Sequence, residues 1–498
     1  MKGLIAILIV ALIAIIVVQI GRLSEIAAKI RGEEEVETRN NNRTAVYMLL
    51  FLIGFLGFCV ISAWVYKDRM FGYGPLKAAS EHGSQLDLIF NITLVWTGIV
   101  FVITHVFLFW FSFKYREDKK RKAYFFPHST KLEIIWTVIP TFVLIFLVVK
   151  GLRIWNDVMF DVDPNDDYIE IEATGYQFAW DLRYPGPDGK LGTRDYKLID
   201  LGSNPLGQDW SDPKNIDDFQ PTEIVLPKGK KVRVRITSKD VLHNFYLPHF
   251  RVKMDAVPGL PTYFIFTPIK TTDEFKQVIR DYPDWQKLSD PDDPESPMRW
   301  EEFNYELACA ELCGSGHYSM RRLVKIVEPD EYEEWLLSQQ SYYMANIRNT
   351  DNDPFKGKLL DIEILERDRE LTSEFNSAME AEGESIIKLK NVFFETGSAK
   401  LTDDSKHELN KLATLLSSKK STLKAELGGH TDNTGDPQSN MNLSEQRAAA
   451  VQQYLFMRGI GADNISTRGY GATQPTDTND TQEGRQNNRR TELKIISK

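Results

Sequence analysis

One short stretch of the chain, residues 309–320, holds two cysteines, a histidine and a methionine. Cys309 and Cys313 stand four residues apart, His317 follows four residues later, and Met320 lies three beyond it. Thiolate, imidazole and thioether donors together select copper over the hard cations, because soft donors suit a soft metal. Two cysteines rather than one predict two copper ions bridged by two sulfurs. Such a pair can share one electron with little movement of its ligands, so the stretch is interpreted as an electron-transfer site.

A second imidazole is expected from elsewhere in the chain. His243 follows a predicted strand, and it supplies the nitrogen that a symmetric pair of copper ions still lacks. A lone histidine is more often a satisfied core residue, and His249 is interpreted in that way. Zinc is the alternative metal, because Cys-x3-Cys-x3-His with a distant histidine offers two sulfurs and two nitrogens to a tetrahedral ion. Met320 is a poor zinc ligand and argues against this alternative.

Period-two alternation predicts the elements that position these ligands. Apolar and charged residues alternate at 169–173, 232–236 and 323–327, which is typical of half-buried strands in a sandwich or barrel. The loops at one end of such a rigid frame hold metal ligands well. Two excursions interrupt the strand pattern: one at about 185–220 is rich in Gly, Pro and Asp, and one at about 273–300 is acidic. They are either solvated surface or docking surfaces for a basic or covalently tethered partner.

The first third of the chain is apolar. Four runs approach or exceed the roughly 20 residues that cross a bilayer, at about 3–20, 44–66, 88–113 and 131–152. The basic loop at 114–122 should be cytoplasmic, which places everything after about 153 in the periplasm. A cleaved signal peptide is the alternative for the first run, but it would turn the metal-binding stretch toward the cytoplasm. That contradicts the charge rule, so an uncleaved first helix is expected.

Length, charge and cysteine content narrow the class of protein. At 498 residues the chain is expected to form about three folded units. Its net charge of −10 argues against nucleic acid as a partner. The third cysteine, Cys59, lies in an apolar run where packing is its expected role, so no disulfide framework is implied. The sequence contains no Cys-x-x-Cys-His, so the chain is predicted to carry no heme of its own.

The last third begins with a polar segment, residues 330–386, which is interpreted as a linker or spacer. Helical stretches are expected in it near 332–344 and 363–380. A compact domain is expected after it. Its predicted elements are a strand at 392–394, a helix at 403–417, a helix from Ser444 that Gly459 stops, and a strand at 492–495. This order of strands and helices is typical of an α/β fold.

From about 88 to 328 the chain resembles subunit II of cytochrome c oxidase, in the heme–copper oxidase family. The resemblance rests on C-x-E-x-C-G-x-x-H-x-x-M at 309–320 and on Val-Lys-Met-Asp-Ala-Val-Pro-Gly at 252–259. It implies a two-helix transmembrane hairpin at 88–155 and a cupredoxin-like sandwich at 156–329.

The same resemblance implies a role for each metal ligand. The implied roles are bridging of both coppers by Cys309 and Cys313, completion of one copper by His243 and Met320, and completion of the other by His317 and the backbone carbonyl of Glu311. The Glu311 side chain would help to bind a magnesium ion shared with subunit I, which suits a hard carboxylate.

Two further positions are implied to handle protons or electrons. Glu133 opens the fourth apolar run, where the family has a glutamate near a proton-uptake path of subunit I. An interfacial carboxylate without a transport role is the alternative. The family usually has Gln-Trp-x-Trp in its first strand, and the first Trp receives the electron. This chain has Phe178 there and Trp180 after it, so electron uptake is expected at one of these two or through a different donor contact, with core packing as the alternative.

Residues 387–498 resemble an OmpA-like peptidoglycan-binding domain. The motifs are Gly-His-Thr-Asp-Asn-Thr-Gly at 429–435, Leu-Ser-Glu-Gln-Arg-Ala at 443–448 and Gly-Arg-Gln-Asn-Asn-Arg-Arg at 484–490. The resemblance implies that Asp432 and Arg447 grip the diaminopimelate of the wall peptide. A carboxylate meets an ammonium group, and a guanidinium forks onto a carboxylate. A surface loop and a solvated helix face are the alternative, and Arg489 and Asn487 would either assist or only hold the fold.

The sequence therefore predicts a multi-pass protein of the bacterial inner membrane with two periplasmic modules. The expected segments are 1–43 and 44–87 with one transmembrane helix each, the hairpin 88–155, the sandwich 156–329, the linker 330–386 and the α/β domain 387–498. The resemblances imply that electrons pass from a c-type cytochrome to the copper pair. They would continue to heme in subunit I, where oxygen becomes water with proton translocation.

Other readings account for less of the sequence. An envelope anchor with a vestigial copper domain, or a copper carrier, would not need the full ligand set. A quinol oxidase subunit would be expected to lack the cysteines. A nitrous oxide reductase shares the copper loop but needs a large propeller domain, whose repeats do not occur in the sequence.

Overall fold

The computed structural model describes residues 2–70, 73–118, 120–163, 165–395, 397–418, 423–461 and 464–497, without the side chains of residues 2–9 and 31. Lys119 of the predicted cytoplasmic loop therefore lies outside the described residues. The chain divides into two compact units. The first comprises Met1–Gln208 and Asp218–Ser341, and the second comprises Asp209–Asp217 and Tyr342–Lys498.

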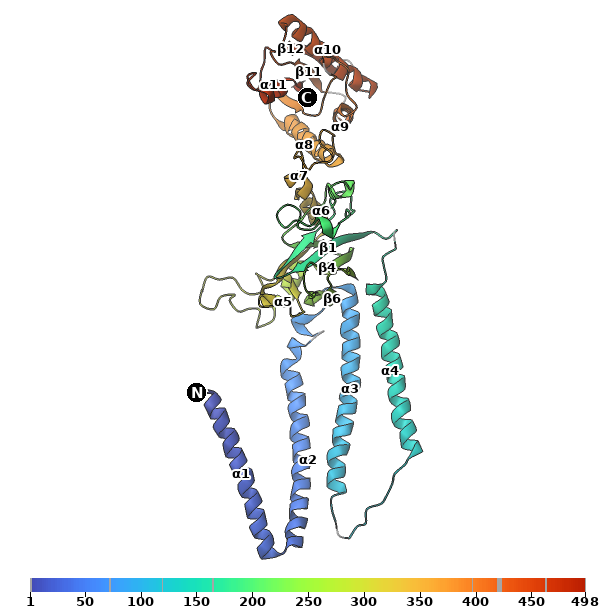
Figure 1. Ribbon diagram of the computed structural model, residues 1–498, viewed down its shortest axis with the longest axis vertical. Coiled ribbons are helices and arrows are strands. Elements are labelled where there is room, and N and C mark those ends of the chain that lie inside the picture. The colour runs from blue at the N-terminus through green and yellow to red at the C-terminus, as the bar shows by residue number, and fades with distance from the viewer. Residues whose placement is uncertain are drawn as a thin grey trace. The chain divides into compact units, whose positions relative to one another are not determined.

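Long helices begin the first unit (Figure 1). They are α1 (Lys2–Arg31), α2 (Glu33–Tyr66), α3 (Glu81–Lys114) and α4 (Thr130–Met159). Among the described residues, these four helices are long and apolar enough to cross a membrane, which confirms the predicted transmembrane section. Their large apolar side chains are mostly exposed, as expected for helices that face lipid or another membrane subunit.

The α3–α4 hairpin contacts the following domain at the start of α3 and the end of α4. The Ser80 hydroxyl, which also caps α3, donates a hydrogen bond to the Phe250 carbonyl at 2.6 Å. At the end of α4, the Met159 carbonyl accepts a hydrogen bond from the Tyr263 hydroxyl at 2.8 Å. The loop 115–129 joins the opposite ends of the two helices. The predicted cytoplasmic loop and the domain that follows α4 therefore lie at opposite ends of the hairpin.

Two sheets follow α4 and share one apolar core. Their strands are β1 (Tyr168–Tyr176), β2 (Ala179–Arg183), β3 (Ile224–Pro227), β4 (Lys231–Ser238), β5 (His243–Leu247), β6 (Val252–Ala256), β7 (Thr262–Phe266), β8 (Tyr305–Cys309) and β9 (Arg321–Val327). The strand orders are β2-β1-β4-β7 and β3-β9-β8-β5-β6. In β4, Val232, Val234 and Ile236 are fully buried while the arginines between them are not. The predicted sandwich and its period-two strands are thus confirmed.

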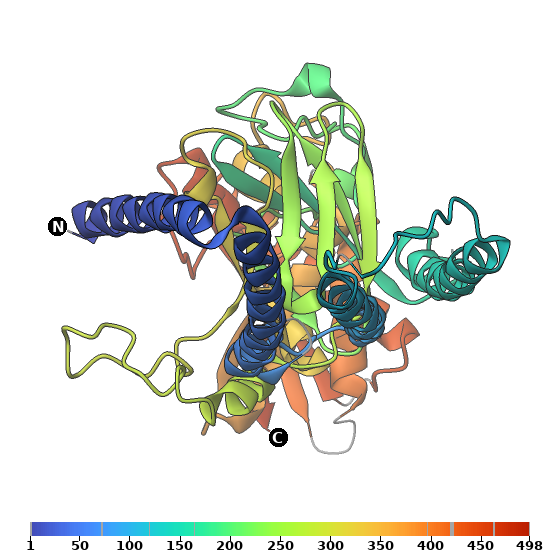
Figure 2. The same cartoon turned by 90° about the horizontal axis from the view of Figure 1, so that it is seen from below.

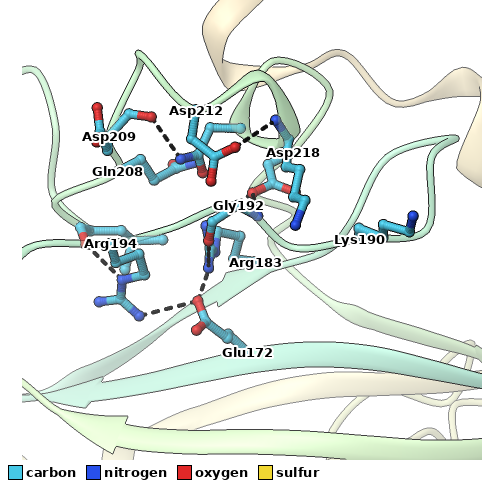
Figure 3. A network of polar contacts seen from close by, with 12 residues as sticks. Glu172, Arg183, Lys190, Gly192, Arg194, Gln208, Asp209, Asp212 and Asp218 are labelled. Atoms are coloured by element: carbon cyan, nitrogen blue, oxygen red, sulfur yellow. Dashed lines mark hydrogen bonds and ion pairs between the residues drawn. The ribbon is translucent and has the colours of Figure 1, made fainter. Parts of the chain in front are cut away.

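A buried network of charges fixes the excursion between β2 and β3 (Figure 3). The Arg183 guanidinium donates to the carboxylates of Glu172 at 2.6 Å and Asp218 at 2.9 Å, and all three residues are buried. Arg194 adds a contact to Glu172 at 3.2 Å. Burial opposes ionisation of Glu172, but Arg183 and Arg194 hold its pKa below the usual value. Removing one partner would leave an uncompensated buried charge, so the network fixes the ends of this excursion to β1 and β2.

The second excursion begins as helix α5 (Thr272–Arg280), which a capping box of Thr271 and Glu274 starts. Beyond it the chain extends away from the strands and returns (Figures 1 and 2). Backbone hydrogen bonds join the two arms, from Ser289 to Pro297 and from Trp300 to Trp285. The acidic residues at the tip are exposed: Asp290, Asp292, Asp293 and Glu295.

His249 packs among aromatic rings of the sandwich and permits a prediction about acid stability. Its ring lies edge-on against Phe275, Phe303 and Tyr305, with centroid distances of 5.2, 5.3 and 5.5 Å. Burial, with a smaller contribution from Arg251, lowers the pKa of His249 from 6.5 to about 4. The folded chain therefore binds fewer protons than the unfolded chain between these two values. The free energy of unfolding should fall as the pH decreases through that window.

The full shift corresponds to about 3 kcal/mol, and we expect about 2 kcal/mol because the His249 side chain is only half-buried. Thermal unfolding of the chain at pH 7 and pH 4 should show this loss, and His249→Phe should reduce it. His407→Phe, at an exposed position of helix α9 (Ser405–Ser417), is the matched control. Equal acid sensitivity of the unaltered chain and the His249→Phe variant would contradict the prediction.

The segment 330–386, interpreted as a linker with helical stretches near 332–344 and 363–380, forms helices close to both predicted stretches. They are α6 (Pro329–Ser338) in the first unit, and α7 (Tyr342–Asn346) and α8 (Asp361–Glu380) in the second. In the second unit, Trp210 stacks on Tyr342 with ring centroids 5.8 Å apart. The fully buried Tyr343 forms a small apolar core with Ile216.

The C-terminal domain is α/β, as predicted. Its sheet has the order β10-β13-β11-β12. The elements are β10 (Ser385–Leu389), α9 (Ser405–Ser417), β11 (Lys424–His430), α10 (Pro437–Met457), β12 (Ile465–Gly471), α11 (Gln482–Asn488) and β13 (Thr491–Ser497). Its core contains residues of α8, including Leu371 and Phe375, so this helix belongs to the domain.

Two predicted secondary-structure elements within this domain differ from the structure: the start of one helix and the position of the first strand. Helix α10 begins at Pro437, capped by Asp436, and Ser444 lies inside it. The Ser444 hydroxyl instead accepts a hydrogen bond from the Gly471 amide at 2.9 Å, so the residue serves tertiary packing rather than helix initiation. The first strand is β10. The predicted strand at 392–394 forms only an isolated bridge at Phe394, because the backbone N–H groups of Asn391 and Phe393 donate to the side chains of Glu408 and Ser405.

Candidate metal centre

Two neighbouring strands bring the distant histidine and the cysteines together. His243 begins β5 and Cys309 ends β8, and these antiparallel strands pair with Phe245 opposite Cys309. Within the part of the chain that the structure describes, the ligand atoms of His243, Cys309 and Cys313 form a group that could hold a metal, all within 4.8 Å of one another. All three residues are buried. Sheet pairing therefore supplies the ligand that the short stretch lacks.

The remaining donors face the same two sulfurs. The Cys309 Sγ atom lies 3.9 Å from His243 Nδ1 and 3.2 Å from the Glu311 carbonyl oxygen. The Cys313 Sγ atom lies 3.6 Å from His317 Nδ1 and 3.8 Å from Met320 Sδ. The structure thus brings together all the residues that the sequence predicts as copper ligands. Two sulfurs, two imidazole nitrogens, a thioether and a carbonyl oxygen are donors that suit a pair of copper ions.

Asp240 orients the His243 ring, a role that sequence reasoning missed. Its Oδ1 atom lies 2.8 Å from His243 Nε2, which leaves Nδ1 to face Cys309. Its Oδ2 atom accepts a hydrogen bond from the Gln177 amide at 2.8 Å. Burial opposes ionisation, but these contacts hold the pKa of Asp240 below its usual value. A carboxylate behind a ligating histidine fixes its tautomer and ring orientation, and its place three residues before His243 was the available signal.

Gln177 and Phe178 cover the metal-binding loop. The Gln177 side-chain amide donates a hydrogen bond to the Cys313 carbonyl. A Cβ atom added to Gly314 or Gly316 would lie 2.9 or 2.5 Å from the Phe178 ring, so only glycine allows this close approach. Phe178 is itself half-buried. The family's tryptophan position is therefore occupied by a ring that lies on the loop.

Trp180 lies beneath this cover. It is 1% exposed, and its ring packs edge-on against Phe245 at 5.7 Å and 6.1 Å from the His243 ring. Of the two predicted electron-uptake residues, Phe178 is the one that reaches the surface. Sequence reasoning also missed two exposed residues of the loop, Leu312 and Tyr318, which are 80% and 83% exposed. An aromatic residue between the ligands His317 and Met320 was the signal for the second.

The environment of the Cys313 thiol disfavours its ionisation. Burial, and then the neighbouring Cys309, raises the pKa of Cys313 to about 11. The thiol is therefore protonated at neutral pH in the absence of a metal. Because thiolate is the ligand form, metal binding must release this proton.

Two predicted carboxylates lie apart from the sulfur cluster. The Glu311 side chain is exposed, although its carbonyl oxygen faces Cys309. Glu133 is exposed in the first turn of α4, next to the loop 115–129. Each therefore remains available to a neighbouring subunit.

The predicted wall-binding residues, Asp432 and Arg447, belong to the second unit. Asp432 follows β11 and accepts a hydrogen bond from the Thr434 amide at 2.9 Å. The Arg447 guanidinium, from α10, lies over the Phe394 ring at 4.9 Å, and its Nε atom donates to the Ser398 carbonyl at 3.0 Å. The nearest cation to Asp432 is one that the sequence left open: Arg489 Nη1 lies 2.5 Å from its Oδ2 atom. His430 is buried and stacks on Tyr470, so it shapes the loop.

Family models match the chain in three places. The transmembrane domain of cytochrome c oxidase subunit II matches residues 70–154, and its periplasmic domain matches residues 169–272. The OmpA family matches residues 393–489. The periplasmic match includes His243, while the stretch 309–320 lies beyond its end.

Known proteins of the same family align with this chain over most of their own length. The alternative cytochrome c oxidase subunit 2 of Bradyrhizobium diazoefficiens is 32% identical over 308 residues, which cover 61% of this chain and 95% of the relative. Cytochrome c oxidase subunit 2 of Cereibacter sphaeroides is 26% identical over 281 residues, which cover 53% and 79%. A crystal structure of the periplasmic domain of subunit II of cytochrome oxidase from Bradyrhizobium japonicum is 27% identical and covers 36% of this chain and 96% of that chain, with a TM-score of 0.22. The chain therefore belongs to the cytochrome c oxidase subunit II family and carries a C-terminal domain of the OmpA family.

Proposed function

We propose that this chain is the electron-accepting subunit of a bacterial cytochrome c oxidase, and that it attaches to peptidoglycan through its C-terminal domain. The electron-accepting role is supported by one observation: several potential metal-binding atoms surround the sulfur atoms of Cys309 and Cys313. Two imidazole nitrogens, a thioether and a carbonyl oxygen lie between 3.2 and 3.9 Å from Cys309 or Cys313 Sγ. Membership in the subunit II family supports the same role.

The chain's own residues would hold the copper pair and exclude water from it. When bound, the pair would accept and release one electron at a time. Asp240 holds the His243 ring, while Gln177 and Phe178 cover the loop. A ligand set held by such supporting contacts moves little when its charge changes, which favours fast electron transfer.

The wider assembly follows from the family. A c-type cytochrome would donate the electron, with the half-buried Phe178 as the favoured contact, because Trp180 is buried. Heme in subunit I would receive it and reduce oxygen to water with proton translocation. The exposed Glu311 carboxylate would help to bind magnesium at the contact with subunit I. Glu133, at the opposite end of the hairpin from the sandwich, would lie near a proton-uptake path.

The location follows from the same arrangement. The four membrane helices would pack against subunit I and other oxidase subunits in the inner membrane. The sandwich and the C-terminal domain would both lie in the periplasm, where Asp432 and Arg447 could reach the wall peptide.

Copper reconstitution of the purified full-length chain tests the metal assignment. We expect about two copper ions per chain and, after partial reduction, one unpaired electron delocalised over both in electron paramagnetic resonance. The physical reason is that two sulfurs within one 4.8 Å group can bridge two metals. Binding of a single zinc ion in preference to copper, or a single-copper spectrum, would reject the proposal. Zinc and copper content measured on the same sample separates these outcomes.

A further inference from the structure

The excursion between β2 and β3 leaves the first compact unit and returns to it. Its residues Asp209–Asp217 belong to the second unit, while the residues on both sides of them belong to the first. The chain therefore passes between the units three times, at 208–209, at 217–218 and at 341–342. A C-terminal domain joined through an ordinary linker uses only the last of these passages. The first two add a second physical connection.

Within the second unit, the segment 209–217 contributes two apolar side chains to a small core. Ile216 is 8% exposed and belongs to the same core as the fully buried Tyr343 of α7. Trp210 packs against this core, and its ring stacks on that of Tyr342 with a centroid distance of 5.8 Å and an interplanar angle of 5°. Large aromatic side chains in such well-packed positions commonly supply most of the binding energy of an interface.

Helix α7 is in turn held to the rest of the second unit. The Tyr343 hydroxyl donates a hydrogen bond to the Asp353 carboxylate. Arg348 pairs with Asp353 at 3.0 Å and with Glu363 of α8 at 2.8 Å. Helix α8 belongs to the core of the C-terminal domain, where Phe375 is 1% exposed. Contacts therefore run without a break from the segment 209–217 to the C-terminal domain.

Both ends of the segment are fixed in the first unit by buried polar contacts. Asp218, which follows the segment, accepts a hydrogen bond from Arg183 at 2.9 Å, and both side chains are fully buried. Gln208, which precedes it, is also fully buried and accepts a hydrogen bond from the Gln220 side-chain amide at 3.0 Å. Pulling on the segment would expose or separate these groups, and breaking a buried ion pair is strongly unfavourable.

We propose that the segment 209–217 is a strap that holds the C-terminal unit to the sandwich domain by apolar packing. It acts in parallel with the covalent connection through α6. When the C-terminal domain is bound to an immobile surface, the strap shares the load that would otherwise pass through residues 339–341 alone. The inference concerns contacts within the chain and does not rest on wall binding.

The test cuts the covalent connection and measures whether the two parts stay together. A site-specific protease sequence, flanked by glycine and serine, is inserted after the exposed Gln340, in the irregular chain between α6 and α7. The full-length chain carries an affinity tag at Met1, is purified in detergent and is cleaved to completion. We expect the C-terminal fragment to remain on the affinity resin with the membrane part through repeated washes.

Variants on both sides of the contact identify the strap. Trp210→Ala combined with Ile216→Ala should release the cleaved fragment at least about 100-fold faster, because two core side chains are lost. Tyr342→Ala leaves the excursion unaltered and should release the fragment about fivefold faster or more. Tyr196→Ala combined with Leu201→Ala is the matched control from the same excursion. These side chains are 78% and 81% exposed, so release should be as slow as in the unaltered chain.

Three outcomes would overturn the inference. Immediate loss of the fragment from the cleaved but otherwise unaltered chain would show that the strap does not hold. Equal release from the Trp210→Ala, Ile216→Ala chain and the unaltered chain would show that other contacts hold the fragment. Release from that double variant but not from Tyr342→Ala would trace the loss to a misfolded excursion, and the strap would again be rejected. Copper binding and wall binding are measured separately, so their failure is distinguishable from each of these results.

Discussion

Replacing Cys313 by serine is expected to abolish the delocalised copper signal and electron uptake from cytochrome c. Cys313 contacts two of the predicted ligands, His317 at 3.6 Å and Met320 at 3.8 Å, so its loss leaves both without their sulfur neighbour. Changes in residues that merely support metal ligands already cost about 10–100-fold in affinity or activity, so loss of a bridging ligand should cost more than about 100-fold. Copper content should fall below two ions per chain.

The chain supplies its own control for this experiment. Cys59, in α2, is a cysteine outside the cluster, and Cys59→Ser should leave copper content and activity unchanged. Copper content, paramagnetic resonance and oxidation of reduced cytochrome c should be measured on both variants in the assembled oxidase. A Cys313→Ser variant that retains two copper ions and a delocalised electron would contradict the assignment of this sulfur as a bridge.

Replacing Asp432 or Arg447 by alanine is expected to remove binding to diaminopimelate-type wall without affecting oxidase activity. Asp432 would lose its contact with the ligand ammonium group, and Arg447 its contact with a carboxylate. Each charge-assisted hydrogen bond contributes about 1.5–3 kcal/mol, so each change should weaken binding about 10-fold or more. Pull-down of the oxidase on purified peptidoglycan measures the loss.

A matched arginine, Arg458, serves as a control for a general effect of lost positive charge or impaired folding. Arg458 lies over the Tyr454 ring at 5.3 Å, much as Arg447 lies over Phe394 at 4.9 Å, and both belong to the same domain. Arg458→Ala should therefore retain wall binding. If Asp432→Ala and Arg447→Ala also bind the wall as well as the unaltered chain, the anchoring role is refuted. Cytochrome c oxidation, measured in the same samples, should be equal in all four proteins.

The ligands could be predicted because most of them lie in one short stretch with fixed spacing. Cys309, Cys313, His317 and Met320 can reach common metal ions whatever the rest of the chain does. Predicting His243 required one further inference. The short stretch offers one imidazole where a symmetric copper pair needs two, and His243 follows a predicted strand. The membrane helices and half-buried strands were also predictable, since their hydrophobic patterns depend on local sequence and on the solvent that each face meets.

The predicted ends of helices and strands were wrong where a polar side chain makes a tertiary contact instead of a local one. Ser444 has the chemistry of a helix cap, but inside α10 its hydroxyl binds the Gly471 amide of a neighbouring strand. The apolar residues at 392–394 resemble a strand, yet side chains of α9 capture the adjacent backbone N–H groups. A sequence pattern cannot distinguish these uses, because the partner is brought near only by folding.

By itself the sequence determined the donor types, the membrane spans and the two folded modules that follow them, because these depend on composition and on spacing along the chain. Only the tertiary structure decided three contacts. Asp240 pairs with the His243 ring, Phe178 covers the loop, and Arg489 forms an ion pair with Asp432. The physical reason is that such contacts join residues from separate elements. Their geometry is fixed by how strands pair and how loops pack, which no local periodicity records.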